Sequence, residues 1–119
     1  MNLVFVYGTL KRGASNHRHL IGQAFVGSAR TAPGYRLFKL EGYPGMVIDA
    51  NDRLGVEGEV WSVDDVWQQH LDKFEGVPEG HYRRQPVSLM APYADRVVEA
   101  YVYSLGVTGR VEVGPVWTE

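Results

Sequence analysis

The sequence predicts an α+β fold: a small mixed, mostly antiparallel β-barrel with one long helix and one or two short helices. Short stretches rich in β-branched and aromatic residues recur along the chain, as in proteins built from many short strands. The 14 glycines are spread out, which is typical of tight turns between such strands. Only one long segment has helical spacing, so strands and helices do not alternate as in a parallel α/β sheet.

The expected strands are the stretches in which β-branched and aromatic residues concentrate. Within 54–63, for example, Val56, Gly58 and Val60 fall on one face of an extended chain and the residues between them on the other, a period of two. A short helical turn is expected at 16–23. The strands are expected at residues 2–7, 24–30, 35–40, 46–49, 54–63, 82–90 and 97–104.

One long helix is expected at residues 64–75. Ser62 and Asp65 fit a capping box with Asp in place of the usual Glu. Asp64 and Asp65 also suit the positive end of the helix dipole, and Gly76 ends the helix. The expected apolar face of this helix consists of Val63, Val66, Trp67, His70, Leu71 and Phe74.

All of residues 1–119 are expected to form a single domain, since the chain has the length of one hydrophobic core. The net charge is −2 (12 basic minus 14 acidic residues), without a basic patch. Nucleic acid and anionic membrane surfaces attract basic proteins, so neither is an expected partner. The oligomeric state does not follow from the sequence.

The absence of cysteine excludes disulfides, a thiol nucleophile and thiolate metal sites. It is consistent with a reducing compartment. The apolar run at the N-terminus is too short for a signal peptide, and no segment approaches the about 18 apolar residues of a membrane span. A cytoplasmic location is therefore expected.

Glu75 is the first candidate for chemistry. A carboxylate in the last turn of a helix opposes the helix dipole, and Leu71, Phe74 and Val77 are near enough in sequence to remove it from water. Both effects raise the pKa of a carboxyl group, which suits it to proton transfer near neutral pH. The alternative is an ordinary solvated glutamate at a helix end.

The segment YGTLKRGAS is the second candidate. Gly8 and Gly13 have the G-x-x-x-x-G spacing of a phosphate loop, but Ala14 and Ser15 stand where Lys and Ser or Thr belong. Nucleotide binding is therefore not expected. The turn at Gly8 either connects two elements or forms a nest of backbone N–H groups for a carboxylate, and the residues alone leave both interpretations open.

No metal or cofactor site is expected. His17 and His19 have no ligand spacing to acidic partners, and His70 is interpreted as a hydrogen-bonded core residue of the helix. No G-x-S-x-G elbow is present, which argues against a serine hydrolase. The aromatic residues lack basic neighbours for binding bases and are interpreted as core and pocket lining.

Two separated stretches, VFVYGTLKRGASNH and LDKFEGVPEGHYRRQPV, resemble the signature regions of the γ-glutamylcyclotransferase-like superfamily. The nearest branch is that of the γ-glutamylamine cyclotransferases and their small bacterial relatives. Weaker similarity follows in the expected order in GYPGMVI and VEGEVWSVD, so the resemblance covers roughly residues 2–104. The tail LGVTGRVEVGPVWTE lies outside it.

The resemblance implies a metal- and cofactor-independent enzyme that releases 5-oxoproline from small γ-glutamyl compounds. By position, the catalytic glutamate of the family falls on Glu75, and the turn at Gly8 becomes a ligand-holding loop. A non-catalytic module that binds a small metabolite on the same barrel is the alternative. The implied substrate-binding residues are Tyr7, Gly8, Thr9, Leu10 and Tyr82.

Overall fold

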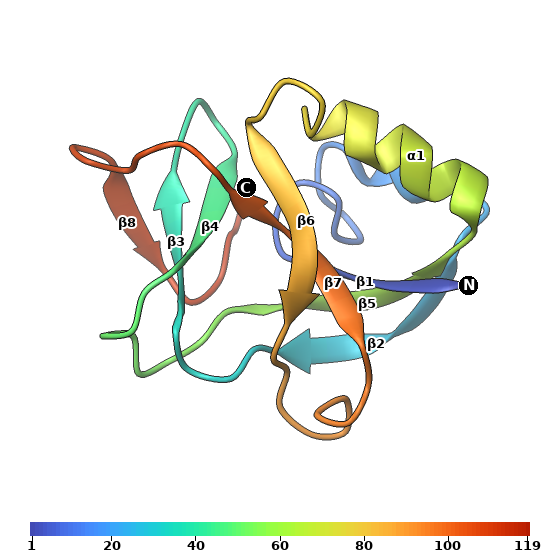
Figure 1. Ribbon diagram of the computed structural model, residues 1–119, viewed down its shortest axis with the longest axis horizontal. Coiled ribbons are helices and arrows are strands. Elements are labelled where there is room, and N and C mark those ends of the chain that lie inside the picture. Colours follow the sequence, from blue (N-terminus) through green and yellow to red (C-terminus); the bar gives the residue numbers. More distant parts are fainter.

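A single curved sheet of eight strands forms most of the protein (Figure 1). The computed structural model describes residues 1–119. Besides the strands it contains one α-helix, α1 (Asp65–Phe74), and one 3-10 helix, η1 (His17–Leu20). The strands are β1 (Asn2–Val6), β2 (Ala24–Arg30), β3 (Tyr35–Lys39), β4 (Pro44–Ile48), β5 (Glu57–Val63), β6 (Tyr82–Val87), β7 (Val98–Tyr103) and β8 (Val111–Gly114).

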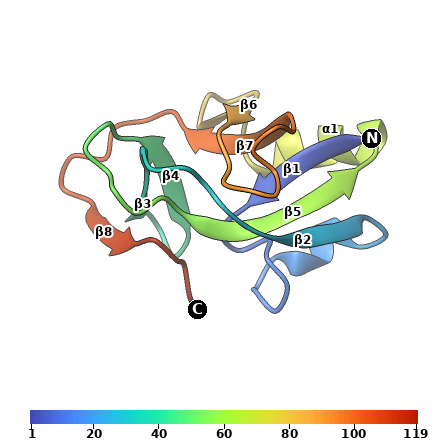
Figure 2. The same cartoon turned by 90° about the horizontal axis from the view of Figure 1, so that it is seen from below.

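The sheet has the order β2-β5-β1-β7-β4-β3-β8, with β6 paired to β7 beside this path. Only the pairs β1–β7 and β4–β7 are parallel, and the other five are antiparallel. Figure 2 shows β1, β2 and β5 on one side of the molecule and β3, β4 and β8 on the other, with the sheet curling between them into a half-barrel. The predicted α+β class with a mixed, mostly antiparallel sheet is confirmed.

Strand β7 is the branch point of the sheet. One of its edges pairs with β6 from Val98 to Tyr103. The other edge is shared, because β1 pairs with Glu99 and Ala100 whereas β4 pairs with Val102. The chain that leaves β1 must therefore turn away where β4 begins to pair, and the two strands diverge at this point.

Both faces of the central strands are buried. On β5, Val60 packs into one hydrophobic cluster together with Phe5 and Met46, whereas Trp61 packs into a second cluster with Leu71 of α1. The predicted period of two is therefore confirmed for β5. The helix covers the opposite face of the sheet from the first cluster, so a face that would otherwise be solvated becomes a second core.

Helix α1 begins differently from the predicted capping box. Asp64 is the N-cap, and its side chain accepts a hydrogen bond from the Trp67 N–H at 2.7 Å. Ser62 is not available as a cap because β5 continues through Val63 and pairs Ser62 with Leu3. The Ser62–Asp65 prediction is therefore wrong by two residues. None of the helices is long and apolar enough to cross a lipid bilayer.

The predicted apolar face of α1 is only partly buried. Leu71 is fully buried, but Val66 is 77% exposed and His70 is also exposed, so the interpretation of His70 as a core residue is wrong. The helix instead presents Gln68 and Leu71 to the sheet. His70 lies on the flank facing η1, where its Nε2 is 3.0 Å from Nδ1 of His19.

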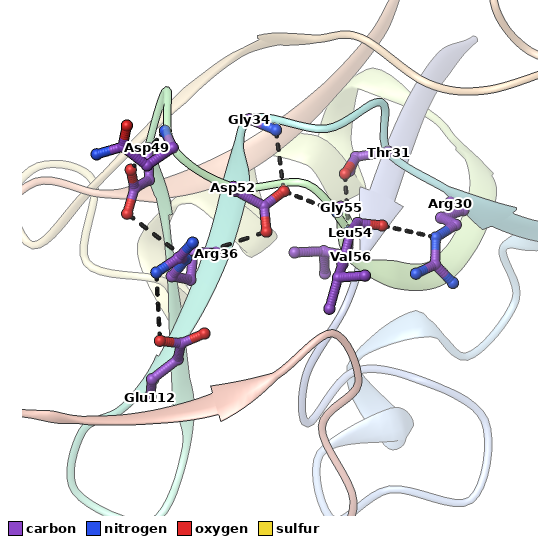
Figure 3. A network of polar contacts seen from close by, with 11 residues as sticks. Arg30, Thr31, Gly34, Arg36, Asp49, Asp52, Leu54, Gly55, Val56 and Glu112 are labelled. Carbon is purple, nitrogen blue, oxygen red and sulfur yellow. Dashed lines mark hydrogen bonds and ion pairs between the residues drawn. The ribbon is translucent and has the colours of Figure 1, made fainter.

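The remaining elements are joined by a polar network around Asp52 (Figure 3). Asp52 Oδ2 accepts hydrogen bonds from the N–H groups of Gly34 at 2.9 Å and Gly55 at 2.7 Å. The Arg36 guanidinium lies within 4.0 Å of Asp52 and 3.3 Å of Glu112 on β8. The network thus holds the loop between β4 and β5 in a turn, which explains why β5 starts at Glu57 and not at residue 54.

Strand β8 was not predicted from the sequence. This strand pairs with β3, where Lys39 faces Val111 and Phe38 faces Glu112. Its four residues contain only two alternating valines, which is too short a signal for a period of two. The pairing with β3 extends the sheet and brings the C-terminal tail back toward β1.

Replacing Asp52 by Asn is expected to destabilise the protein at neutral pH by about 1–3 kcal/mol, because two buried N–H groups lose a charged acceptor. Burial would raise the pKa of Asp52, but the backbone hydrogen bonds outweigh it and hold the pKa below its ordinary value. The stability that Asp52 contributes is therefore present above about pH 4 and lost as the pH falls through the folded-state pKa. Urea unfolding from pH 2.5 to 8 checks this.

The matched control is Asp95→Asn, the same change at an exposed loop position. We expect its unfolding free energy to follow the wild type at every pH. A constant deficit for Asp52→Asn that persists at pH 2.5 would show that the charge of Asp52 does not stabilise the turn.

Candidate active site

A pocket of about 460 Å³ opens where β1 and β4 diverge from each other along the edge of β7. Five segments form its wall: the loop after β1, the start of β4, the end of α1, the start of β6 and the end of β7. In Figure 1 the last turn of α1 and the start of β6 lie at the top of the molecule, next to the loop that leaves β1. All six residues singled out from the sequence line this one pocket: Tyr7, Gly8, Thr9, Leu10, Glu75 and Tyr82.

Tyr7 closes the gap in the sheet. Its hydroxyl donates a hydrogen bond to the Tyr101 carbonyl of β7 at 2.7 Å and accepts one from the Met46 N–H of β4 at 3.2 Å. The hydroxyl thereby takes the place of a backbone group at the branch point. Since both of its hydrogen bonds are made to the fold, Tyr7 lines the pocket with its ring.

Tyr82 is also tied to the fold. Its hydroxyl donates to the Pro44 carbonyl at 2.9 Å, and its ring makes an edge contact with Tyr103 at 5.3 Å between centroids. The side chain is 6% exposed. Tyr82 therefore connects β6 to β4, and its ring forms part of the pocket wall.

The turn at Gly8 leaves three backbone donors unused. The N–H groups of Gly8, Thr9 and Leu10 donate no hydrogen bond within the protein. Gly8 itself packs so closely on Pro44 that a Cβ there would lie 2.7 Å from the Pro44 ring. Successive free N–H groups in a turn that lines a pocket can hold a carboxylate or a developing oxyanion.

The end of the loop is fixed by Asn16. Its N–H donates to the Thr9 carbonyl at 2.9 Å, and its side-chain amide donates to the Thr9 hydroxyl at 3.0 Å. Asn16 also lines the pocket. Asn16 was not predicted as a site residue from the sequence, although Asn is common in turns because its side chain bonds to nearby backbone.

The two cations that follow the turn do not line the pocket. Lys11 Nζ donates to the Trp117 carbonyl at 2.7 Å. Arg12 donates to Glu59 through both its backbone N–H and its Nε, and its guanidinium lies 3.6 Å from the centre of the Phe25 ring. These cations anchor the loop to the fold and leave its backbone as the part that faces the pocket.

The C-terminal tail secures the same loop from outside. The Trp117 side chain is 8% exposed and packs in the cluster that contains Phe5 and Met46. The Glu119 carboxylate accepts hydrogen bonds from the Ser15 N–H at 3.0 Å and the Ser15 hydroxyl at 3.2 Å. The tail, for which the sequence predicted no role, therefore supports the loop.

Glu75 is placed by the way α1 ends. The Gly76 N–H donates to the Lys73 carbonyl and the Val77 N–H to the Asp72 carbonyl, the pair of bonds that defines a Schellman motif. Gly76 has a φ of +74°, and a Cβ there would lie 2.7 Å from Nδ1 of His81. The predicted helix stop is therefore confirmed, and it orients the last helical residues over the pocket.

The Glu75 carboxylate makes no hydrogen bond and no ion pair within the protein. Burial raises the pKa of Glu75 to about 7. Burial also raises the pKa of Tyr7, Tyr82 and Tyr101, and the Glu75 charge is a further cause in each. A carboxyl group of this kind exchanges its proton near neutral pH, which is the property needed for acid–base chemistry.

A polar network holds the last turn of α1 on the sheet. Asp72 pairs with the Arg84 guanidinium at 2.9 Å and accepts a hydrogen bond from the Tyr101 hydroxyl at 2.7 Å. That hydroxyl accepts a hydrogen bond from Gln68 at 2.8 Å. Asp72 lies three residues before Glu75, so the network fixes the catalytic candidate relative to β6 and β7. Sequence spacing gave no signal for it, because its members come from three elements.

No group of three or more His, Asp or Glu side chains is arranged to hold a metal ion.

Comparison with known proteins gives consistent findings. A family model described as gamma-glutamyl cyclotransferase, AIG2-like, matches residues 4–116. The gamma-glutamylaminecyclotransferase of Homo sapiens is 36% identical over 139 residues, covering 100% of this chain and 85% of the human protein. The resemblance in the two sequence motifs is therefore confirmed.

Solved structures share the fold. An AIG2-like protein from Mus musculus superposes with a TM-score of 0.73 at 30% identity, covering 89% of this chain and 78% of the mouse chain. A uropathogenic E. coli-specific protein superposes with a TM-score of 0.78 at 26% identity, covering 94% of this chain and 87% of the other.

Replacing Gly76 by Ala is expected to destabilise the protein more than replacing Gly80 by Ala. Both glycines have positive φ, +74° and +81°, so each Ala carries a backbone strain of about 1–2 kcal/mol. Only at Gly76 does the new methyl group also meet His81, since the space around Gly80 is open. Thermal and urea unfolding of both variants check this, and equal losses would contradict the described contact.

Replacing Glu75 by Gln is expected to stabilise the protein above pH 7. The raised pKa of Glu75 means that its stabilising effect is complete below about pH 4.5 and is lost as the pH rises through about 7. At pH 8 the variant should gain up to about 3 kcal/mol over the wild type, and near pH 4 the two should be alike. Urea unfolding at both pH values tests this, with the exposed Glu79→Gln as the matched control.

Proposed function

Since the chain belongs to the gamma-glutamyl cyclotransferase, AIG2-like family, we propose that it releases 5-oxoproline and a free amine from a γ-glutamyl amine or γ-glutamyl peptide. In this proposal it is a lyase-type cyclotransferase that works without a cofactor. The observation that carries the proposal is Glu75, an unpaired carboxyl group with a pKa of about 7 in the pocket that the Gly8 turn also lines.

The reaction requires an internal attack. The substrate's α-amine attacks its own γ-carbonyl carbon, a new N–C bond closes the five-membered ring, and the original amide C–N bond breaks. An α-amino group has a pKa of about 8, so most substrate molecules carry it in the protonated form at neutral pH. The proton must be removed before the nitrogen can attack. Glu75 in its ionised form accepts the proton, and the leaving amide nitrogen takes one back from the same carboxyl group as the bond breaks.

The substrate is held by the loop backbone and the aromatic walls. The N–H groups of Gly8, Thr9 and Leu10 supply donors for the α-carboxylate or for the oxyanion that forms on the γ-carbonyl. The rings of Tyr7 and Tyr82 enclose the folded glutamyl chain. Holding that chain bent for ring closure removes much of the orientational barrier, several kcal/mol in well-ordered systems.

A non-catalytic binding module is not favoured. The matching family and the human relative are both named for a cyclotransferase, and the pocket keeps an ionisable carboxyl group at Glu75. No feature of the site favours a nucleic acid or a membrane as a partner. A cytoplasmic location stays a prediction from the cysteine-free sequence.

The test of the proposed function is incubation with a panel of γ-glutamyl amines and γ-glutamyl dipeptides, with 5-oxoproline measured by mass spectrometry. Release of 5-oxoproline together with an equal amount of the amine supports the proposal. The absence of 5-oxoproline from every compound would overturn it.

The Glu75→Gln variant is expected to lose turnover by about 10²–10⁴-fold, because the amide keeps the shape of the side chain but neither accepts nor releases a proton near neutral pH. Binding of 5-oxoproline, measured by calorimetry, should survive because the Gly8 turn is unchanged. For the wild type, kcat/KM should rise with pH through about 7 as the Glu75 carboxylate forms.

The Glu79→Gln variant, an exposed glutamate four residues away, should retain wild-type turnover. A folded Glu75→Gln protein with near-normal turnover would remove Glu75 from the mechanism. Loss of 5-oxoproline binding in parallel with turnover would instead make Glu75 a structural residue.

A further inference from the structure

Two histidines meet where η1 lies against α1. Nδ1 of His19 on η1 is 3.0 Å from Nε2 of His70 on α1. The ring centres are 5.2 Å apart, close to the largest separation that this distance between the nitrogens allows, so the rings meet edge to edge. This is the arrangement of an N–H···N hydrogen bond, in which one nitrogen donates and the other accepts. The lone pairs do not converge on a common point, as those of two ligands of one metal ion do.

The histidine contact joins the two segments that carry the two halves of the candidate site. The segment η1 begins directly after Asn16, which lines the pocket and anchors the turn at Gly8. His70 lies on the helix whose end carries Phe74 and Glu75, and both of these residues line the pocket. A contact between η1 and α1 therefore affects how the carboxyl group is placed relative to the turn.

His19 is held to α1 in three ways. Its carbonyl accepts a hydrogen bond from the Trp67 indole N–H, and its Nδ1 contacts His70. Its ring stacks on the ring of Phe74, with 4.1 Å between the centres and 29° between the planes. Phe74 directly precedes Glu75 in the chain. The His19 ring thus supports the end of the helix at the residue next to the catalytic candidate.

The charges around the histidine pair are positive. Neither histidine lies within 4.0 Å of a carboxylate. Arg18 precedes His19 on η1, and Lys73 lies one turn after His70 on α1. The other side chains in contact with the pair are uncharged aromatic rings. Burial, together with the charges of Arg18 and His70, lowers the pKa of His19. A second positive charge on the pair therefore has no counter-ion.

The contact tolerates one extra proton but not two. When both imidazoles are neutral, or when one of them is charged, one facing nitrogen carries a hydrogen and the other keeps a lone pair. A single charge strengthens this hydrogen bond, because a charged donor bonds more strongly than a neutral one. When both imidazoles are charged, each facing nitrogen carries a hydrogen, no acceptor remains, and two like charges repel each other.

We propose that His19 and His70 form a proton-controlled latch between η1 and α1, which is closed while at least one of the two imidazoles is neutral and opens when both are charged. The closed latch holds Phe74 in place, so the two histidines act as positioning residues for Glu75. The latch itself is independent of the reaction, whereas its effect on turnover rests on the proposed function.

The opening of the latch is tested by hydrogen exchange of the Trp67 indole N–H, which bonds to the His19 carbonyl. The Trp61 indole N–H, held by Glu59, is the internal reference. NMR gives the ratio of the two exchange rates from pH 7.5 to 4.5. In the wild type the Trp67 rate should rise at least about threefold relative to Trp61, because the lowered pKa of His19 makes the latch weaken as the pH falls below about 6.5.

The matched variant is His70→Gln, whose amide takes the position of Nε2 and can donate or accept a hydrogen bond but does not titrate. The ratio of the two exchange rates should stay constant with pH in this variant. Because His70→Gln retains Glu75, any effect of that carboxyl group on the exchange rates appears in both proteins.

The effect on turnover is tested by the acid limb of kcat/KM, measured as release of 5-oxoproline. If Glu75 alone takes up a proton, kcat/KM falls about tenfold per pH unit below about 7. Opening of the latch should make the wild-type decline steeper below about pH 6, toward about a hundredfold per unit, since a second proton is then involved. His70→Gln should match the wild type at pH 7.5 and keep the shallower decline.

Two further variants complete this arm. His70→Ala lacks the contact at every pH, so its kcat/KM should be lower than that of the wild type at pH 7.5 by about threefold or more, with the shallower decline below it. Gln69→Ala changes the exposed neighbouring position of the same helix and should keep both the wild-type value and the wild-type decline.

The outcomes separate the latch from the proposed function. An exchange ratio that stays constant in the wild type, or that responds to acid equally in His70→Gln, would overturn the latch. If the ratio responds as expected but the wild type and His70→Gln share one acid limb, the latch does not position Glu75, and that part of the inference is wrong. If no compound yields 5-oxoproline, the proposed function fails, and the exchange ratio alone decides whether the latch exists.

Discussion

The shared edge of β7 is the constraint on which the site depends. Two parallel neighbours, β1 and β4, cannot both continue along one edge, so one chain must leave where the other begins to pair. At this point the Tyr7 hydroxyl bonds to two backbone groups, the Tyr101 carbonyl of β7 and the Met46 N–H of β4. The departing chain forms the Gly8 turn, and the space between the strands becomes the pocket. The divergence of the two strands thereby leaves a pocket whose walls are held by buried strands.

Glu75 differs from the other carboxylates around the core in having no partner. Asp52 accepts two backbone N–H groups, Glu59 pairs with Arg12 and Asp72 pairs with Arg84. Such pairing holds a carboxylate in its ionised form, whereas burial without pairing favours the protonated form. The protein thus contains both arrangements, and the unpaired one occurs at the pocket. The Schellman motif and the Asp72 network satisfy the polar groups around Glu75. The cost of an unpaired buried carboxyl group is therefore confined to this one side chain.

Much of this could be predicted from the sequence, because the signals were local. Seven strands, the helix and its glycine stop follow from periodicity and turn chemistry, and Glu75 was singled out by its position at the helix end. The wrong predictions concern residues whose surroundings are set by contacts with residues distant in the sequence. His70 has helical spacing but lies on the flank facing η1, and Ser62 is paired within β5 instead of capping α1. No local pattern specifies the order of strands in the sheet. That order determines the role of the tail, the free N–H groups of the Gly8 turn and the Asp72 network.

The absence of lysine and arginine from the pocket wall bears directly on the proposed role of Glu75. A lysine or arginine in this wall would stabilise the ionised form of Glu75 and lower its pKa. The carboxylate would then be a weaker base for the proton of the substrate's α-amine at the start of the reaction, and less of the group would be protonated near neutral pH. A single carboxyl group that performs both transfers near neutral pH therefore requires surroundings poor in positive charge. The fold meets this requirement, because Lys11, Arg12 and Arg84 are each held by partners that do not line the pocket.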